Sequence, residues 1–117
     1  MKQLKNIKRK LEWEEYYDPD FDWGNWEFYY NNDLSEDFIR EFQDKVDWEY
    51  ISCYPDLSEG FIREFKDKVD WYWISFRQTL SEDFIIEFQD KVNWNMILTY
   101  QNLSQEFKNK YTIKFKF

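Results

Sequence analysis

The chain of 117 residues contains no histidine, and this absence removes several kinds of chemistry at once. Acid–base catalysis by an imidazole, Ser-His and Cys-His dyads, and metal ligation by histidine all need a side chain that the sequence lacks. With only two glycines there is also no glycine loop for binding phosphates. The composition therefore argues against an enzyme, and it indicates no catalytic residue and no cofactor.

Cysteine, glycine, proline and alanine are also scarce or absent. Cys53 is the only cysteine, which excludes an intrachain disulfide, and its apolar neighbours favour a packed small hydrophobic residue over a reactive thiol. Two glycines and two prolines are too few for a β-sandwich rich in tight turns. Because alanine is absent, the aromatic residues, which make up 24% of the chain, have to supply the core.

The sequence has no run of about 18 apolar residues, so we expect no transmembrane helix and no membrane association. The N-terminal segment MKQLKNIKRK is basic, but it lacks the apolar core and the cleavage site of a signal peptide. A single cysteine fits a reducing compartment. These features predict a cytoplasmic protein.

Charge is unevenly distributed. Residues 1–11 hold five basic groups and residues 108–117 hold four, and neither segment contains an acid. Residues 12–107 therefore contain the other seven of the 16 basic groups and all 24 acids, a net charge of −17. Such a segment repels nucleic-acid phosphates and attracts basic surfaces. Direct nucleic-acid binding is therefore not expected. A recognition role for this charge and a simple solvated surface both remain open.

A block of 23 residues is repeated in the middle of the chain. It reads LSEDFIREFQDKVDWEYISCYPD from Leu34, and close copies begin at Leu57 and Leu80, with a truncated copy from Leu103. Self-similarity at a fixed period predicts a stacked array. We expect one domain over residues 1–117, with full repeats at 34–56, 57–79 and 80–102, a degenerate N-terminal part at 1–33 and a truncated repeat at 103–117.

Each repeat is predicted to form two helices. Numbered from its leucine, the repeat has apolar residues at positions 1, 5, 6, 9 and 13, which is helical spacing. This pattern predicts a first helix of about eleven residues, capped by the serine at position 2. A second helix of about seven residues is expected after the N-cap residue at position 14, which a tryptophan follows. The capping residues are Ser35, Ser58, Ser81, Ser104, Asp47, Asp70 and Asn93.

The fold class is therefore all-α: a short α-solenoid of stacked two-helix repeats with degenerate N- and C-terminal caps. Glu41–Lys45, Glu64–Lys68 and Glu87–Lys91 have the spacing of i,i+4 ion pairs within the first helix. Asn25-Trp26 resembles the start of a second helix. Leu4, Ile7 and Leu11 suggest a basic capping helix that ends before Pro19. The alternating segment TIKFKF, residues 112–117, suggests a strand-like tail.

The two halves of the repeat differ in how much they vary. The first copy agrees with each of the other two at 13 of the first 15 positions, but at only two of the last eight. In repeat arrays, ligand specificity is usually carried by residues that vary over a constant frame. Positions 17 and 21 lie on one helical face and hold residue types common at binding hot spots. The candidate residues are Tyr50, Tyr54, Trp73, Arg77, Met96 and Tyr100.

Two of these features have a second interpretation. The candidate aromatic residues would also serve to fill the grooves between repeats, and we expect the tryptophan at position 15 to be core. The acidic segment from Asp18 starts like a calcium loop, but Trp23 stands where the turn glycine belongs and Tyr29 where the bidentate glutamate belongs. We therefore expect no metal site.

The motif LSEDFIREFxDKVDWxxIS resembles a tandem repeat of uncharacterised proteins from giant DNA viruses and from phages with AT-rich genomes. The resemblance covers residues 34–102 and implies a viral or phage protein acting in the host cytoplasm. From the variable helix face and the acidic surface we expect a non-enzymatic protein-binding module. The resemblance favours a specific version of it, an inhibitor of a host defence protein such as an anti-CRISPR. That inhibitor would mimic nucleic acid by presenting acids, including Glu36, Glu59 and Glu82, to a basic surface of its partner. The alternative is a structural, self-associating module, and the oligomeric state is left open.

Overall fold

The computed structural model describes residues 10–114, and every regular element within this range is a helix. This confirms the all-α repeat fold. The helices are η2 (Lys10–Tyr17), α1 (Trp26–Asn31), α2 (Glu36–Glu41), α3 (Trp48–Cys53), α4 (Glu59–Glu64), α5 (Trp71–Arg77), α6 (Glu82–Glu87), α7 (Trp94–Tyr100) and α8 (Gln105–Lys114).

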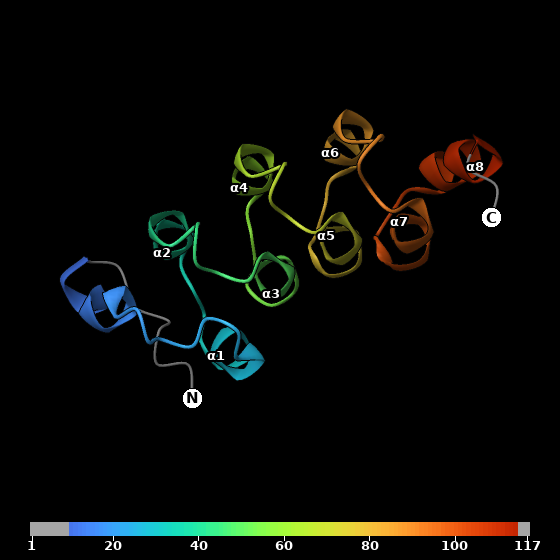
Figure 1. Cartoon of the computed structure of the whole chain (residues 1–117). Helices are drawn as coiled ribbons and strands as arrows, with labels where there is room; N and C mark the ends of the chain where they lie inside the picture. Colours follow the sequence, from blue (N-terminus) through green and yellow to red (C-terminus); the bar gives the residue numbers. More distant parts are fainter. Residues whose placement is uncertain (1–9, 115–117) are drawn as a thin grey trace.

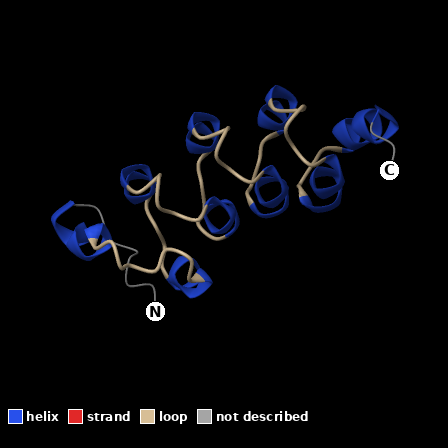
Figure 2. Cartoon of the chain, viewed as in Figure 1, coloured by secondary structure: helices blue, strands red, loops and turns tan. Residues whose placement is uncertain are grey.

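The helices form two parallel rows, which Figures 1 and 2 show end-on. We call η2, α2, α4, α6 and α8 the A row, and α1, α3, α5 and α7 the B row. The closest backbone approaches between helices are in the B row, from α1 to α3, α3 to α5 and α5 to α7. The rows bend together, with the B row on the inner side of the bend (Figure 1). The described array measures 51 × 25 × 21 Å.

The predicted caps are present in every repeat. The hydroxyl oxygens of Ser35, Ser58 and Ser81 accept hydrogen bonds from backbone N–H groups in the first turns of α2, α4 and α6. Asp47, Asp70 and Asn93 cap the B-row helices in the same way, and Asn25 caps α1. The degenerate repeat was therefore correctly placed at Asn25-Trp26.

The predicted length of the first helix was wrong. Helices α2, α4 and α6 have six residues and not eleven. Phe42 leaves helical geometry with φ −107° and ψ 26°, and a separate turn follows in which Lys45 and Val46 donate to the Phe42 carbonyl. The Trp48 indole N–H donates a hydrogen bond to the Gln43 carbonyl at 2.9 Å. In a continuing helix this carbonyl would accept from a backbone N–H instead.

Both predictions for the chain ends need correction. Thr112, Ile113 and Lys114 belong to α8 and not to a strand, because Phe107 and Tyr111 lie on one helical face and pack on Trp94. The rest of the TIKFKF segment lies outside the described residues. Leu4 and Ile7 also lie outside them, and Leu11 belongs to a 3₁₀ helix rather than to an α-helix.

Aromatic stacking joins each repeat to the next. Trp48 lies 5.1 Å from Phe65 and 6.3 Å from Phe61, both of which belong to the following repeat. Trp71 repeats these contacts with Phe84 and Phe88, and Trp94 stacks on Tyr111 at an interplanar angle of 11°. The position-15 tryptophan is therefore packed between repeats, as expected.

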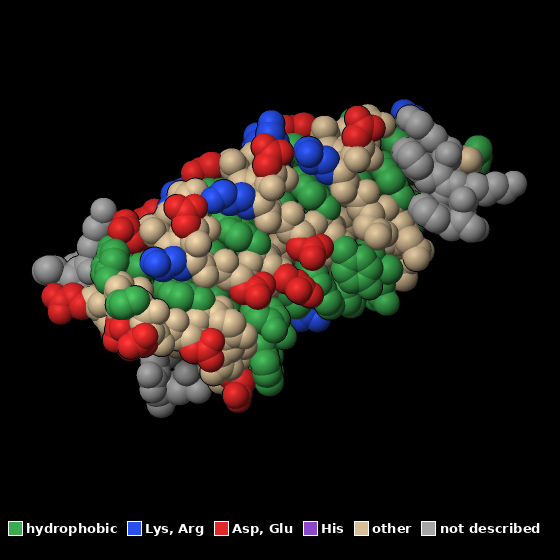
Figure 3. Space-filling view, in the orientation of Figure 1, with side chains coloured by type: hydrophobic (Ala, Val, Ile, Leu, Met, Phe, Trp, Pro, Cys, Tyr) green, Lys and Arg blue, Asp and Glu red, His purple; other side chains and the backbone are tan. Residues whose placement is uncertain are grey.

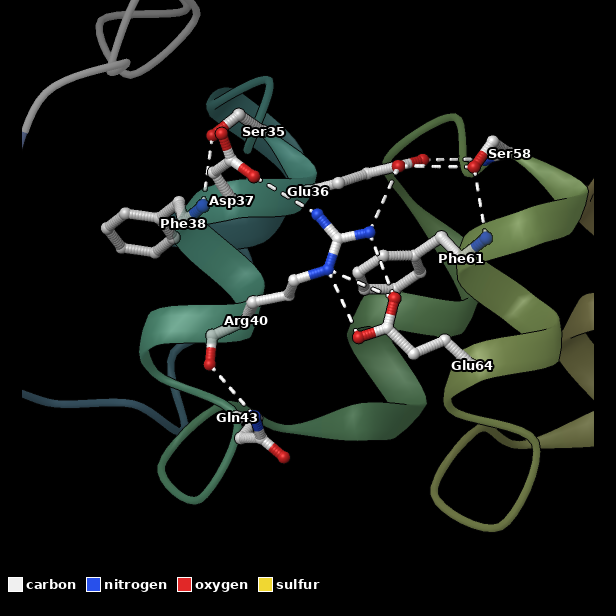
Figure 4. A network of polar contacts seen from close by, with 9 residues as sticks. All are labelled: Ser35, Glu36, Asp37, Phe38, Arg40, Gln43, Ser58, Phe61 and Glu64. Carbon is white, nitrogen blue, oxygen red and sulfur yellow. Dashed lines mark hydrogen bonds and ion pairs between the residues drawn. The ribbon is translucent and has the colours of Figure 1, made fainter.

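Ion pairs also run between repeats, which corrects the predicted i,i+4 pairs. Arg40 contacts Glu64 at 3.0 Å and Arg63 contacts Glu87 at 2.7 Å, while Lys68 contacts Asp44 at 3.2 Å. The A-row helices end at the glutamates, so the lysines four residues later do not lie one helical turn above them. Figure 4 shows the Arg40 guanidinium between Asp37, Glu36 and Glu64, and it lies 5.3 Å from the Phe61 ring centre.

A buried glutamine provides a polar link on the B side of the stack. Gln78, only 4% exposed, accepts from the Leu57 N–H and donates to the carbonyls of Ser52 and Pro55. Gln101 makes the equivalent bonds to Leu80, Ser75 and Gln78. Each glutamine therefore satisfies backbone groups that the loop between repeats would leave unpaired.

Replacing Gln78 by leucine tests this link. Leu57 N–H and two carbonyls lose their partner in a buried place, so we expect Gln78→Leu to lower the free energy of unfolding by about 2–3 kcal/mol. Urea denaturation followed by tryptophan fluorescence measures this loss. The exposed neighbour Thr79 supplies the control, since Thr79→Ala should change stability by less than about 0.5 kcal/mol. Equal midpoints for Gln78→Leu and the unmodified chain would contradict the assigned role.

The Arg63–Glu87 pair predicts a pH effect. The hydrogen bond from Arg63 lowers the pKa of the Glu87 carboxyl, so the pair stabilises the fold above the unfolded-state pKa, and this stabilisation is lost as the pH falls through the folded-state pKa. We expect Glu87→Gln to lower the melting temperature at about pH 7 and to have a smaller effect at about pH 3, where protonation of Glu87 has begun to remove the ion pair. Thermal unfolding at the two pH values checks this. A difference that is the same at both pH values would contradict it.

Candidate functional site

The outward side of the B row carries a continuous set of large side chains, which we call the B face. It is formed by positions 16, 17, 20 and 21 of successive repeats, because positions 18 and 19 of the full repeats pack against the core, where all are buried except the partly buried Leu98. Its residues are Trp26, Tyr30, Glu49, Tyr50, Cys53, Tyr54, Tyr72, Trp73, Phe76, Arg77, Met96 and Tyr100. Figure 3 shows hydrophobic side chains gathered along this lower edge of the molecule.

The six residues predicted from positions 17 and 21 all lie on the B face. Arg77 and Tyr100 are exposed, whereas Tyr50, Tyr54, Trp73 and Met96 are partly buried. Trp73 donates its indole N–H to Glu49 of the preceding B-row helix, α3, at 3.3 Å. The rings of Tyr50 and Tyr29 have their centres 5.3 Å apart. The half-buried rings therefore fill grooves between repeats, as the packing interpretation expects. Arg77 and Tyr100 instead face solvent.

Sequence reasoning missed four aromatic members of the surface. Three of them are among the most exposed large side chains of residues 10–114: Trp26 at 47%, Tyr30 at 57% and Tyr72 at 44%. The fourth, Phe76, packs on Tyr100 with ring centres 4.4 Å apart. Positions 16 and 20 carried the signal, since Trp26 and Tyr30 are four residues apart after a recognised N-cap.

The B face has a regular pattern across its three helix–helix junctions. At each junction, position 20 of one helix meets position 21 of the next. Tyr30 meets Tyr54 with ring centres 5.5 Å apart between α1 and α3, and Phe76 meets Tyr100 between α5 and α7. Between α3 and α5 the corresponding residues are Cys53 and Arg77. An aromatic pair therefore stands on each side of a central cation.

Arg77 is the only basic residue in the four B-row helices. Its guanidinium lies 5.7 Å from the Phe76 ring centre, and it forms no ion pair with any residue of 10–114. Burial raises the pKa of the Cys53 thiol, and the nearby positive charge of Arg77 opposes this only in part. Cys53 is accordingly held as a neutral thiol, which agrees with its expected packing role.

The acidic candidates Glu36, Glu59 and Glu82 lie on the A row and have a structural role. Each carboxylate accepts from the backbone N–H and the hydroxyl of the serine that caps the next A-row helix. For Glu36 and Ser58 the two distances are 2.7 and 3.1 Å, and Glu59–Ser81 and Glu82–Ser104 repeat the arrangement. Both oxygens are thus engaged, so charge reversal at these positions would disturb folding as well as any binding.

The variable part of the repeat, positions 16–23, also contains residues that hold the stack. Ser52 and Ser75, at position 19, are fully buried, and each hydroxyl accepts from the N–H of the cap residue of the next helix at 2.8 or 2.9 Å. Tyr29, one period before Ser52, does the same for Asp47. Together with Gln78 and Gln101 at position 22, these residues hold the stack. Only positions 16, 17, 20 and 21 remain for the surface, together with the exposed position 23.

Residues 10–114 contain neither a cluster of possible metal ligands nor a membrane-spanning helix. No three carboxylate or thiol side chains of this range lie close enough together to hold a metal ion. Asp18 and Asp22 instead accept backbone N–H groups two residues later, which shapes the loop before α1. None of the described helices is long and apolar enough to cross a bilayer.

Searches for similar proteins found no match among family models, curated proteins or solved structures. The candidate site is therefore defined by its geometry.

Alanine substitutions separate the packing members of the B face from the exposed ones. Trp73 fills a groove and bonds to Glu49, so Trp73→Ala should lower the free energy of unfolding by about 2 kcal/mol. Arg77→Ala, at an exposed side chain, should change it by less than about 0.5 kcal/mol. Urea denaturation of both variants measures the difference. Equal losses would mean that Arg77 is also a packing residue.

Proposed function

We propose that this chain is a non-enzymatic protein-binding module that contacts its partner through the B face. The single observation that carries the proposal is the exposure of aromatic side chains around one arginine on the inner side of a rigid array. Tyrosine, tryptophan and arginine dominate binding hot spots, because each combines a large contact area with a polar group. Contiguous exposed aromatic surface on a small domain is typical of an interaction site.

Packing alone does not account for these side chains. The interior of each repeat is already filled by residues with 0–2% exposure, such as Phe38, Ile39 and Ile51. Tyr30 and Tyr100 are more than half exposed and add only one ring contact each at a junction. The middle junction is built with Cys53 and Arg77, so the stack does not require a ring pair there.

A finer version concerns the acidic charge. The carboxylates of the A row and the loops, such as Asp56, Asp83 and Asp90, are exposed. We propose that they favour a partner with a basic surface, as expected for a viral or phage inhibitor that occupies a nucleic-acid site of a host defence protein in the cytoplasm. The net charge of the middle segment supports this version.

Self-association is the second candidate function. Burial of exposed rings on the B face against a second copy would stabilise a dimer or a larger assembly. Static light scattering across a range of concentrations distinguishes the two functions, since a strict monomer at high concentration eliminates self-assembly.

The proposed function is tested with variants of the B face. A partner is first captured from a host lysate by the full-length chain, identified by mass spectrometry and purified. We then expect Tyr30→Ala and Tyr100→Ala each to weaken its binding by about tenfold or more, which corresponds to loss of a hot-spot contact. Biolayer interferometry measures the dissociation constants.

The matched control is Ile86→Ala, which removes an exposed apolar side chain from the opposite row. It should leave the affinity unchanged. Asp56→Lys with Asp90→Lys tests the acidic version, because affinity should fall with this charge reversal and with added salt if the partner surface is basic. Unchanged affinity in both B-face variants would overturn the proposed function.

A further inference from the structure

We propose that the segment captured by the B face is a proline-rich peptide in the polyproline II conformation. It carries one carboxylate that contacts Arg77 and one apolar side chain on each side, three residues away. This inference rests on the proposed function and specifies the chemistry of its ligand.

The charge of the ligand follows from the state of Arg77. The other two arginines of residues 10–114, Arg40 and Arg63, each contact a glutamate of the next repeat at 3.0 Å or less. Arg77, which lies in the B row, has no carboxylate partner within the described range. An arginine presents a planar set of donors that matches a carboxylate. A ligand carboxylate would form with Arg77 the kind of ion pair that Arg40 and Arg63 form with glutamates within the chain.

The apolar contacts follow from the two aromatic pairs. Tyr30–Tyr54 lies one helix junction before the Cys53–Arg77 junction, and Phe76–Tyr100 lies one junction after it. A ligand whose carboxylate contacts Arg77 therefore has one aromatic pair within reach on each side, each of them one helix junction away.

The spacing selects the conformation of the ligand. Packed helices are about 8–10 Å apart, so each junction is displaced from the next by about this distance. A polyproline II helix has three residues per turn and rises about 3.1 Å per residue, which places every third side chain on one face at intervals of about 9 Å. A β-strand alternates its faces with a period of two, so its third residue points away from the surface. Apolar-x-x-acid-x-x-apolar in polyproline II form matches the three junctions.

The polar groups of the surface fit the same ligand. The backbone carbonyls of a polyproline II segment have no internal hydrogen bonds and remain available as acceptors. The hydroxyls of Tyr30, Tyr72 and Tyr100 stand on exposed side chains and can donate to them. Aromatic-lined surfaces of this kind are a recurring means of binding proline-rich segments.

The acids of the B-row helices limit the ligand to few negative charges. Glu27 and Glu49 are the only acids within α1, α3, α5 and α7, and Glu49 accepts the Trp73 indole N–H. With one cation against two carboxylates, additional acids in a ligand would be repelled. A single carboxylate opposite Arg77 is the arrangement that the charges favour.

The test uses four synthetic peptides with blocked ends and the full-length chain. The proposed ligand is FPPEPPF; FPPQPPF removes the charge, FPPKPPF reverses it, and FGSEGSF keeps the charge and the rings but lacks the polyproline II preference. Binding is measured by tryptophan fluorescence and by isothermal titration calorimetry. We expect FPPEPPF to bind about tenfold more tightly than FPPQPPF and FGSEGSF, and FPPKPPF not to bind measurably.

Variants of Arg77 identify the contact. Arg77→Gln should weaken FPPEPPF about tenfold and remove its advantage over FPPQPPF, while Arg77→Glu should reverse the preference in favour of FPPKPPF. Urea denaturation confirms that both variants are folded. Equal binding of FPPEPPF and FPPQPPF, an unchanged affinity in Arg77→Gln, or no binding of any peptide at millimolar concentration would each overturn the inference.

These outcomes can be told apart from failure of the proposed function. If no peptide binds but Tyr30→Ala and Tyr100→Ala weaken the captured partner, the B face is an interaction surface for a different ligand. If those variants leave the captured partner unaffected, the proposed function itself fails, whatever the peptides do.

Discussion

Trp48, Trp71 and Trp94 each pack on two aromatic side chains of the following repeat, and the stability of the short helices on both sides depends on contacts of this kind. The helices from α1 to α7 have six or seven residues, far below the length at which an isolated helix is stable. Their stability must therefore come from neighbours. The tryptophan stabilises the stack in two ways. Its ring packs on the next repeat, and its indole N–H donates to a carbonyl just after the C-cap of the A-row helix in its own repeat.

Polar groups then make each repeat depend on the one before it. The glutamate at position 3 bonds to the serine that caps the next A-row helix, and the serine at position 19 bonds to the cap residue of the next B-row helix. Helix initiation in one repeat is thus assisted by side chains of the previous one. Nearest-neighbour coupling of this kind is what makes the energetics of a repeat array nearly one-dimensional. The first repeat keeps the coupling with other residues, since Tyr17 bonds to Glu41 where later repeats use arginine.

The repeat, its caps and its two helices could be predicted from sequence because their signals are local. Ser35 and Asp47 cap helices through residues two or three positions away, and that spacing is visible in the chain. The contacts between repeats join residues 18 to 26 positions apart, and no local rule identifies them. Glu64 and Lys68 have the spacing of a helical ion pair, yet the early end of α4 gives each a partner in another repeat. The same limitation made Glu36, Glu59 and Glu82 look like free surface acids.

The second helix is divided into positions that hold the stack and positions that form the B face, which leaves the B face available for the proposed binding. Ile51, Ser52 and their equivalents hold the stack, and in the later repeats Gln78 and Gln101 close the loop. Positions 20 and 21 meet at every junction, but they use two rings at the outer junctions and Cys53 with Arg77 at the middle one. The B-row helices approach closely at all three junctions. The fold therefore tolerates very different residues there, so the stack itself does not require exposed rings around one arginine.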